Sequence, residues 1–122
     1  HLAGRKKDII IVGGSNVYPD DVEAVLREAP GVKDCSVIGV PDSYFGEATL
    51  AVITTDSSDI DLRRIRVFCA ERLADFQQPQ AYEILDELPR TALGKIQRQV
   101  LRDRYEGYDA TADLRRLMRR GA

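Results

Sequence analysis

The stretch "DIIIVGGSNVYP", residues 8–19, is expected to form the first structural elements of the chain. The β-branched run at residues 8–12 predicts a strand, and Gly13 and Gly14 directly after it indicate a turn. Residues 15–18, SNVY, are the expected partner strand of a short hairpin. Pro19 then starts a helix, because proline suits the first helical turn and the acidic side chains that follow favour the positive end of the helix dipole. The beginning of the chain is therefore predicted as hairpin and then helix.

Further elements follow by periodicity. The first helix has an apolar stripe of Val22, Val25, Leu26 and Ala29. Three apolar or alternating runs predict strands at residues 35–40, 48–55 and 82–85. Leu62, Ile65, Cys69 and Leu73 recur at i, i+3, i+7 and i+11 and predict a second helix, with Asp59 as its expected N-cap.

The remainder of the chain is predicted as loops and helices. Residues 75–80, DFQQPQ, indicate a loop, residues 96–104 a helix, and a further short helix is expected from about Thr111. Because strands and helices are mixed and one hairpin is present, the predicted class is α+β. We expect a small mixed β-sheet of about three strands flanked by helices and preceded by a short β-hairpin.

Composition limits the class of protein. The chain has 122 residues, 43% of them hydrophobic and 31% charged, which is typical of a soluble globular domain. No apolar run approaches the roughly 20 residues that a transmembrane helix needs, and no basic-then-apolar signal segment opens the chain. The only methionine is Met118. His1 is therefore not a natural start, and we expect the chain to be a piece of a longer protein.

The cysteines and the charge distribution disfavour disulfide-bonded, metal-binding and nucleic-acid-binding proteins. Cys35 and Cys69 lie far apart in the sequence without a second pair, so two buried thiols in a reducing compartment are expected rather than a disulfide or a metal site. The total net charge is −2, but the last third of the chain is basic. Its arginines are interleaved with leucines, which predicts a solvated helix face and disfavours nucleic-acid binding. These arginines are Arg98, Arg102, Arg104, Arg115, Arg116, Arg119 and Arg120.

One lysine stands out in the stretch "PRTALGKIQR", residues 89–98, because it follows a glycine in a loop expected to be flexible. A phosphate-binding P-loop is excluded, since that motif needs an earlier glycine and a Ser or Thr after the lysine. Pro89 and Ile96 occupy those positions. From the residues alone, Lys95 is either an ordinary exposed lysine or a functional cation.

Several linked motifs resemble one family. The segment "GRKKDIIIVGGSNVYPDDVE" at residues 4–23 is similar to the start of the small C-terminal domain of AMP-forming acyl-CoA synthetases, which belong to the adenylate-forming superfamily. The segments "VIGVPDSYFGE", "FCAERLADFQQP" and "DELPRTALGKIQR" follow in the family's order and at its spacing. The resemblance covers about residues 4–104, and it favours a functional Lys95.

The resemblance implies a catalytic role for Lys95. Members of the family join a carboxylate to the α-phosphate of ATP, then transfer the acyl group from the acyl-adenylate to CoA. Lys95 matches the lysine that enters the ATP site and stabilises charge on the phosphorus oxygens. Lys7 falls on the hinge about which the small domain rotates between two poses. Arg5 matches the arginine that contacts the nucleotide ribose.

In the second pose, the resemblance implies which residues contact CoA. Gly13 and Gly14 would line the channel for the pantetheine arm, where a side chain would obstruct it, and they would also make an ordinary hairpin turn. Phe45 and Phe76 match positions that stack on the CoA adenine, with burial in the core as the alternative. Gln78 lies in the adjacent CoA loop. Relatives usually have Lys or Arg in this loop, whereas here it contains Gln77, Gln78, Pro79 and Gln80.

The resemblance also implies a domain division and partners. We expect residues 1–8 to be a hinge segment, residues 9–105 a lid domain and residues 106–122 a helical extension. ATP, CoA and Mg²⁺ are the implied cofactors, the last bound mainly by an N-terminal adenylation domain, with a carboxylic acid as substrate and the cytoplasm as location. No metal ligands are expected in this chain. Lys95 also fits the Pro-x4-Gly-Lys pattern at which some bacterial relatives are acetylated, so a lysine acetyltransferase is a further implied partner.

Three functions remain open at this point. The first is an acyl-CoA ligase domain, inactive when isolated. The second is a domain of an acyl-AMP ligase that loads a carrier protein, which the missing cations next to Phe76 leave open. The third is a non-catalytic binding module.

Overall fold

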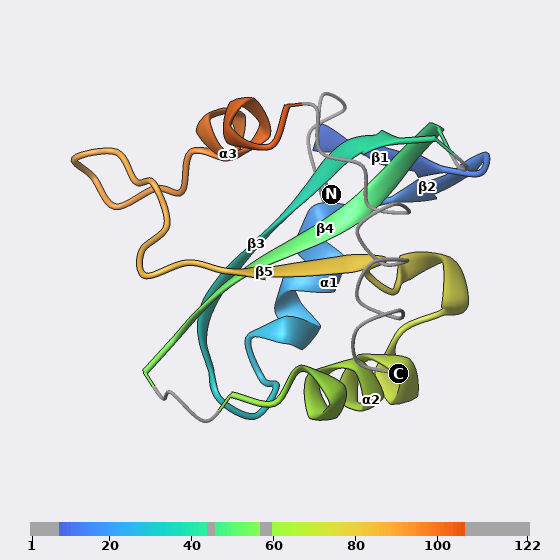
Figure 1. Cartoon of the computed structure of the whole chain (residues 1–122), viewed down its shortest axis with the longest axis horizontal. Coiled ribbons are helices and arrows are strands. Elements are labelled where there is room, and N and C mark those ends of the chain that lie inside the picture. Colours follow the sequence, from blue (N-terminus) through green and yellow to red (C-terminus); the bar gives the residue numbers. More distant parts are fainter. Residues whose placement is uncertain (1–7, 44–45, 57–59, 107–122) are drawn as a thin grey trace.

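The computed structural model describes residues 8–43, 46–56 and 60–106. Two antiparallel hairpins, one parallel strand and three α-helices make up this part (Figure 1). The elements, in chain order, are β1 (Ile10–Val12), β2 (Ser15–Val17), α1 (Pro19–Leu26), β3 (Val32–Asp42), β4 (Gly46–Thr55), α2 (Leu62–Arg72), the 3₁₀-helix η2 (Asp75–Gln77), β5 (Ala81–Ile84) and α3 (Arg98–Arg104).

The first hairpin forms as the sequence predicts. Strands β1 and β2 are antiparallel, with Val12 opposite Ser15 across a two-residue turn. Gly13 and Gly14 make that turn with φ of 55° and 90°. A two-residue turn with φ positive at both positions matches the right-handed twist of its strands, and glycine takes this conformation at no steric cost.

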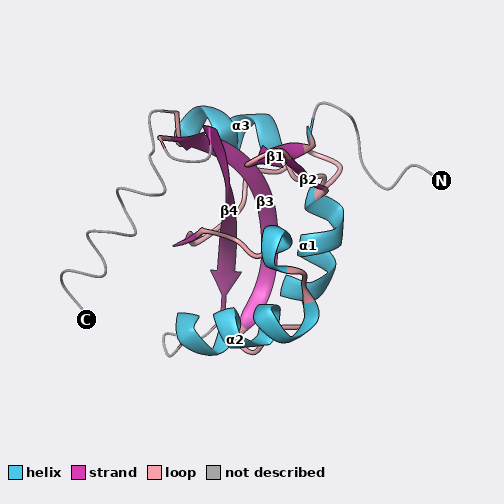
Figure 2. Ribbon diagram, turned by 90° about the vertical axis from the view of Figure 1, so that its right-hand side faces the viewer, coloured by secondary structure: helices cyan, strands magenta, loops and turns pink. Residues whose placement is uncertain are grey.

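The main sheet has the strand order β3–β4–β5. Strands β3 and β4 form a long antiparallel hairpin, whereas β5 runs parallel to β4 after the crossover through α2. In Figure 2, β3 and β4 lie side by side with α1 next to β3, and α3 and α2 lie at opposite ends of the pair. The expected α+β class, with a three-stranded mixed sheet after a hairpin, is confirmed.

Both faces of the central hairpin are buried, because successive residues of a strand point to opposite faces. On one face Cys35, Val37, Ala51 and Ile53 pack against the first hairpin, α1 and α2. On the other face Ile38, Val40, Leu50 and Val52 pack against β5 and α3, together with Leu88 of the β5–α3 loop. The continuous apolar run of β4 follows from this double burial.

The predicted stripes of α1 and α2 face the core, and both cysteines are buried free thiols, as expected. Burial raises the pKa of Cys35 to about 12, and it also raises the pKa values of Cys69 and Tyr82. None of the helices in the described ranges is long and apolar enough to cross a membrane.

Four details differ from the sequence predictions. Helix α2 is capped by Asp61, whose side chain accepts a hydrogen bond from the Arg63 amide at 2.9 Å, while Asp59 lies outside the described residues. Strand β3 is longer than residues 35–40, and α3 starts at Arg98 rather than Ile96. The expected loop at residues 75–80 contains the short 3₁₀-helix η2. The helix predicted from Thr111 falls outside the described residues.

Candidate functional site

The loop that carries Lys95 is a small, ordered hairpin. Its two stems meet where Arg90 bridges Ile96 and where the Gln97 amide donates to the Pro89 carbonyl at 2.9 Å. Near the tip, the Thr91 amide donates to the Lys95 carbonyl at 2.8 Å. The Lys95 amide returns a bond to the Thr91 hydroxyl at 3.2 Å. The flexible loop expected from the sequence is therefore closed by backbone hydrogen bonds.

The tip of this hairpin turns through Gly94. Its φ is 89°, and its amide donates to the Thr91 carbonyl at 2.9 Å. Such a φ favours glycine, and a Cβ at this position would meet nothing within 4 Å, so backbone conformation rather than space requires the glycine. The turn geometry therefore explains why a glycine directly precedes Lys95.

Residues 91–95 are all exposed, and the Leu93 side chain is 97% exposed. The Lys95 ammonium makes no hydrogen bond or ion pair with any residue that the structure describes. The loop projects from one end of the molecule, at the left of Figure 1. This geometry leaves the ammonium group accessible at the surface, without a contact inside the described part of the domain.

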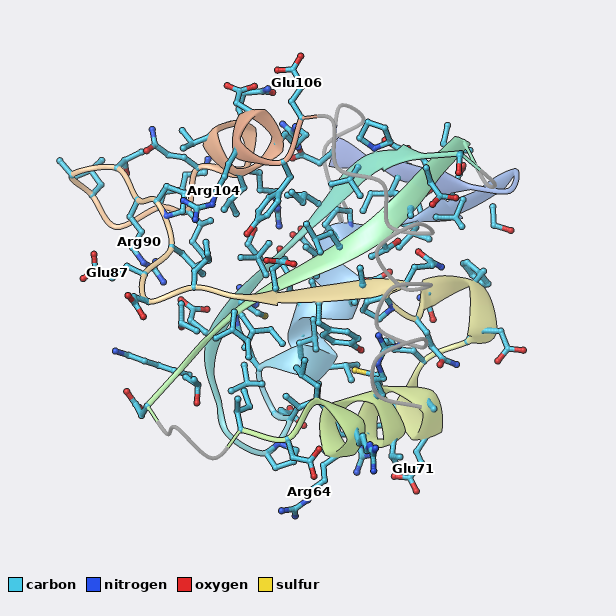
Figure 3. All side chains as sticks on the ribbon, viewed as in Figure 1. Arg64, Glu71, Glu87, Arg90, Arg104 and Glu106 are labelled. Carbon is cyan, nitrogen blue, oxygen red and sulfur yellow. The ribbon has the colours of Figure 1, made fainter. Side chains whose placement is uncertain are left out.

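Arg90 ties the hairpin to the sheet. Its Nη1 donates to the Gly94 carbonyl at 2.7 Å, and its Nη2 pairs with the carboxylate of Asp34 on β3. Asp34 also pairs with Arg27, the C-cap residue of α1, at 3.5 Å. Figure 3 labels Arg90 next to the projecting loop, far from Glu71 on α2. The Arg90 guanidinium thus joins the residue before Lys95 to β3, and Asp34 extends the contact to the C-cap of α1.

A second arginine holds the stem that follows Lys95. Arg98, the first residue of α3, donates to both carboxylate oxygens of Glu23 at 2.8 and 3.3 Å and to Asp20 at 2.8 Å. It also contacts Asp8 at 3.5 Å. Burial disfavours the charge on Arg98, but the hydrogen bonds and charges of Glu23 and Asp20 outweigh it, so its pKa is raised.

This network corrects the interpretation of the basic segment. Arg98 and Arg102 were predicted to lie on a solvated helix face, but their side chains are only 23% and 24% exposed. Arg102 also pairs with Asp8 at 3.3 Å. Glu23 is itself buried and accepts a further bond from the Val37 amide at 2.8 Å. Apart from the i, i+4 spacing of the two arginines, no local sequence pattern indicates these pairs.

The glycine turn predicted to contact CoA lies at the opposite end of the molecule from the Lys95 hairpin (Figure 1). The amide of Ile11 on β1 donates to Glu47 of β4 at 2.7 Å, which holds this hairpin on the sheet. Strand β2 contacts η2, which carries Phe76. The structure therefore brings the predicted CoA residues of the two segments to one end and places Lys95 at the other.

Phe76 is 43% exposed and lies outside both core clusters, which favours an available ring over core burial. The glutamines beside it serve local structure. The Gln77 side chain accepts from the Ala74 amide at 2.9 Å, and the Gln80 side chain accepts from the Thr49 amide at 2.6 Å. Gln78 donates to Asp75 at 3.3 Å. Arg5, Lys7 and Phe45 fall outside the described residues.

The Lys95 hairpin lies at the edge of a matched domain. A profile of the AMP-binding enzyme C-terminal domain family matches residues 21–95 and ends at this lysine. The chain belongs to this family. It is 46% identical over 102 residues to a long-chain-fatty-acid–CoA ligase of Bacillus subtilis, a match that covers 83% of this chain and 18% of that protein.

Solved structures agree with the family assignment. A fatty acyl CoA synthetase of Mycobacterium tuberculosis superposes with a TM-score of 0.81 at 39% identity, over 84% of this chain and 20% of that one. An o-succinylbenzoate CoA synthetase of Bacillus subtilis, in complex with its acyl-adenylate intermediate, superposes with a TM-score of 0.78 at 35% identity. That match covers 84% of this chain and 21% of the other. The chain thus spans about a fifth of the length of these relatives.

Proposed function

We propose that this chain is the mobile C-terminal domain of an ATP-dependent, AMP-forming acyl-CoA ligase. The enzyme would convert a carboxylic acid and ATP to an acyl-adenylate, then form the acyl-CoA thioester. The observation that carries the proposal is the exposed, hydrogen-bonded hairpin that presents Lys95 at the end of a family-matched domain. Relatives named as CoA ligases support the reaction class.

Lys95 supplies the electrostatic part of adenylation in this proposal. Negative charge gathers on the α-phosphate oxygens as the carboxylate attacks and pyrophosphate departs. An ammonium group held at that point stabilises the transition state more than the ground state. Arg5 contacts the nucleotide ribose, and the acid pocket and Mg²⁺ belong to the N-terminal domain. No group of three or more potential metal ligands occurs among the residues that the structure describes.

The separation of the two ends supports domain rotation. The Lys95 hairpin and the Gly13–Gly14 turn lie at opposite ends of the molecule. One fixed pose would have difficulty presenting both to a single reaction centre, so a rotation about Lys7 would present them in turn. Residues 1–8 then form the hinge segment, residues 9–105 the lid and residues 106–122 an extension. In the second pose Gly13 and Gly14 line the pantetheine channel, and Phe76 and Phe45 stack on the CoA adenine.

The test separates the two half-reactions in the full-length enzyme. Lys95→Ala should lower acyl-adenylate formation on the order of 100- to 1,000-fold, while thioester formation from supplied acyl-adenylate is preserved. Lys7→Pro, which fixes φ at the hinge, should instead impair thioester formation more. Lys33→Ala is the matched control, because it removes a surface cation whose one ion pair within the described residues is with Asp56, at 3.5 Å. Equal loss of both half-reactions in Lys95→Ala would refute the role of the lysine.

A carrier-protein acceptor is the second candidate. The loop beside Phe76 contains no Lys or Arg, and two of its three glutamines are engaged with backbone amides. Phosphate contacts of CoA with this loop are therefore weak. The discriminating measurement supplies acyl-adenylate with either CoA or a carrier protein. Product with the carrier alone would replace the CoA proposal with an acyl-AMP ligase.

Two consequences belong to the same proposal. The isolated chain is expected to have no ligase activity, because it lacks the acid pocket assigned to the N-terminal domain, and we place the enzyme in the cytoplasm. The exposure of Lys95 makes it accessible to a lysine acetyltransferase, and acetylation would stop adenylation by removing the charge. Peptide mass spectrometry of the enzyme from cells checks this, and a uniformly unmodified Lys95 would contradict it.

A further inference from the structure

The stems of the Lys95 hairpin are packed against the core, whereas its tip is exposed. Its stems are packed, since Leu88 is 7% exposed within the second core cluster and Ile96 packs against that cluster. Its tip is not packed, since every residue from 91 to 95 is exposed. The apolar core therefore fixes where the hairpin leaves the domain, and polar contacts must fix where its tip points.

Arg90 supplies such a contact between the tip and the sheet. Its Nη1 donates to the Gly94 carbonyl at 2.7 Å, so it holds the peptide group that joins Gly94 to Lys95. Its Nη2 pairs with Asp34. A planar guanidinium can hold both acceptors in a fixed geometry, which a lysine ammonium at the same position cannot reproduce.

Asp34, the partner of this arginine, is held by contacts of its own. It lies on β3 next to an irregularity in the register with β4, and its Oδ1 accepts a bond from the Cys35 amide at 2.8 Å. Arg27 pairs with Asp34 and with the buried Glu23, both at 3.5 Å. Alternating charges thus run from Glu23 through Arg27, Asp34 and Arg90 to the Gly94 carbonyl.

We propose that Arg90 is a positioning residue for Lys95, a role that rests on the proposed function. It sets the direction in which the hairpin tip delivers the ammonium group and does not itself contact the nucleotide. An exposed ion pair contributes little to global stability, and Arg90 is 41% exposed, so its removal should loosen the tip without unfolding the domain. Misplacement of a reacting group by about 1 Å can cost on the order of 100-fold in rate.

The experiment uses the full-length enzyme with Arg90→Ala, Arg90→Lys, Lys95→Ala, the double variant Arg90→Ala/Lys95→Ala, and Lys33→Ala as control. We expect Arg90→Ala to lower kcat for adenylation about 10- to 100-fold with KM for ATP unchanged. Thioester formation from supplied acyl-adenylate and the melting temperature should match those of Lys33→Ala. Arg90→Lys should restore the rate only in part, because the charge returns without the double contact.

The double variant tests whether Arg90 acts through Lys95. If it does, Arg90→Ala adds no further loss to Lys95→Ala, because residues that act as one unit are not additive. A full additional loss would mean that Arg90 acts independently, and the inference would be overturned. Loss of both half-reactions with a lowered melting temperature would also overturn it, since that is a structural role.

The two proposals fail in different ways. If Lys95→Ala leaves adenylation intact, the proposed function fails and this inference fails with it. If Lys95→Ala removes adenylation but Arg90→Ala behaves like Lys33→Ala, only the positioning role is refuted.

Discussion

Replacing Glu23 by alanine should destabilise the domain far more than the loss of a surface charge. The Glu23 side chain is 5% exposed and accepts bonds from the Arg98 guanidinium and the Val37 amide, each at 2.8 Å. The variant leaves Arg98 without its bidentate partner and the Val37 amide without an acceptor. Breaking one side of a buried pair costs about 3–5 kcal/mol, and we expect a loss of that size in the free energy of unfolding.

Glu23→Gln separates charge from shape. The amide oxygen can still accept the bond from Val37, but the charge opposite Arg98 is lost. Because hydrogen bonds to charged groups contribute about 1.5–3 kcal/mol, this variant should lose about that much. Equilibrium urea unfolding of the 122-residue chain measures both losses, with Lys33→Ala expected within about 1 kcal/mol of the parent chain.

A double-mutant cycle then isolates the pair. Arg98→Met keeps the aliphatic stem and removes the charge, and its cost should shrink in the Glu23→Gln background by about 0.5–3 kcal/mol. If Glu23→Ala costs no more than Lys33→Ala, the carboxylate does not hold α3 on α1 and β3. In that case our account of how the stem after Lys95 is fixed would be wrong.

Two further predictions concern Cys35 and Gly94. Burial raises the pKa of Cys35 from 9.0 to about 12, so the native state keeps its proton where the unfolded chain has lost it. The stability that this protonated thiol contributes is complete below pH 9 and is lost as the pH rises toward about 12, at up to about 1.4 kcal/mol per pH unit. Cys35→Ala should therefore flatten the decline of the free energy of unfolding at alkaline pH, as measured by urea unfolding. An unchanged slope would contradict that assignment. In Gly94→Ala, the new Cβ would meet no atom within 4 Å, but the alanine would have to adopt a φ of 89°. This strain of about 1 kcal/mol should reduce adenylation by the full-length enzyme about fivefold. An unaltered rate would show that the turn can rearrange.

Local pattern was enough to predict most of the elements. The Gly13–Gly14 hairpin, the stripes of α1 and α2, and the mixed sheet follow from side-chain period and turn chemistry, both of which are short-range properties. Asp59 was the wrong cap because Asp61 lies at the residue directly before the helix, and the two candidates differ by only two positions. Such an offset at a helix end is within the ordinary uncertainty of sequence reasoning.

The ionic contacts that hold the Lys95 hairpin could not be predicted in this way. Arg98 lies 75 residues from Glu23 in the sequence, and Arg90 lies 56 residues from Asp34. On its own helix, the spacing of Arg98 and Arg102 is indistinguishable from that of a solvated face. The packing of α3 against β3 brings Arg98 within reach of the acidic side chains of α1.

The order of the Lys95 loop was also missed. Glycine and proline indicated a turn between residues 89 and 98, but they did not reveal that Thr91 closes it by bonds to both backbone groups of Lys95. The role assigned to Lys95 came from the resemblance to a family. The structure adds the contacts of Arg90 and Arg98, which hold the two stems on either side of Lys95.

The central claim is that the Lys95 ammonium reaches the phosphorus oxygens during adenylation. A crystal structure of the full-length enzyme with a non-hydrolysable acyl-adenylate mimic measures this directly. We predict that Lys95 Nζ lies about 3 Å from an oxygen of the phosphate-mimicking group in the adenylation pose. Structures in which the amine stays far from the nucleotide in every arrangement of the two domains would contradict the account.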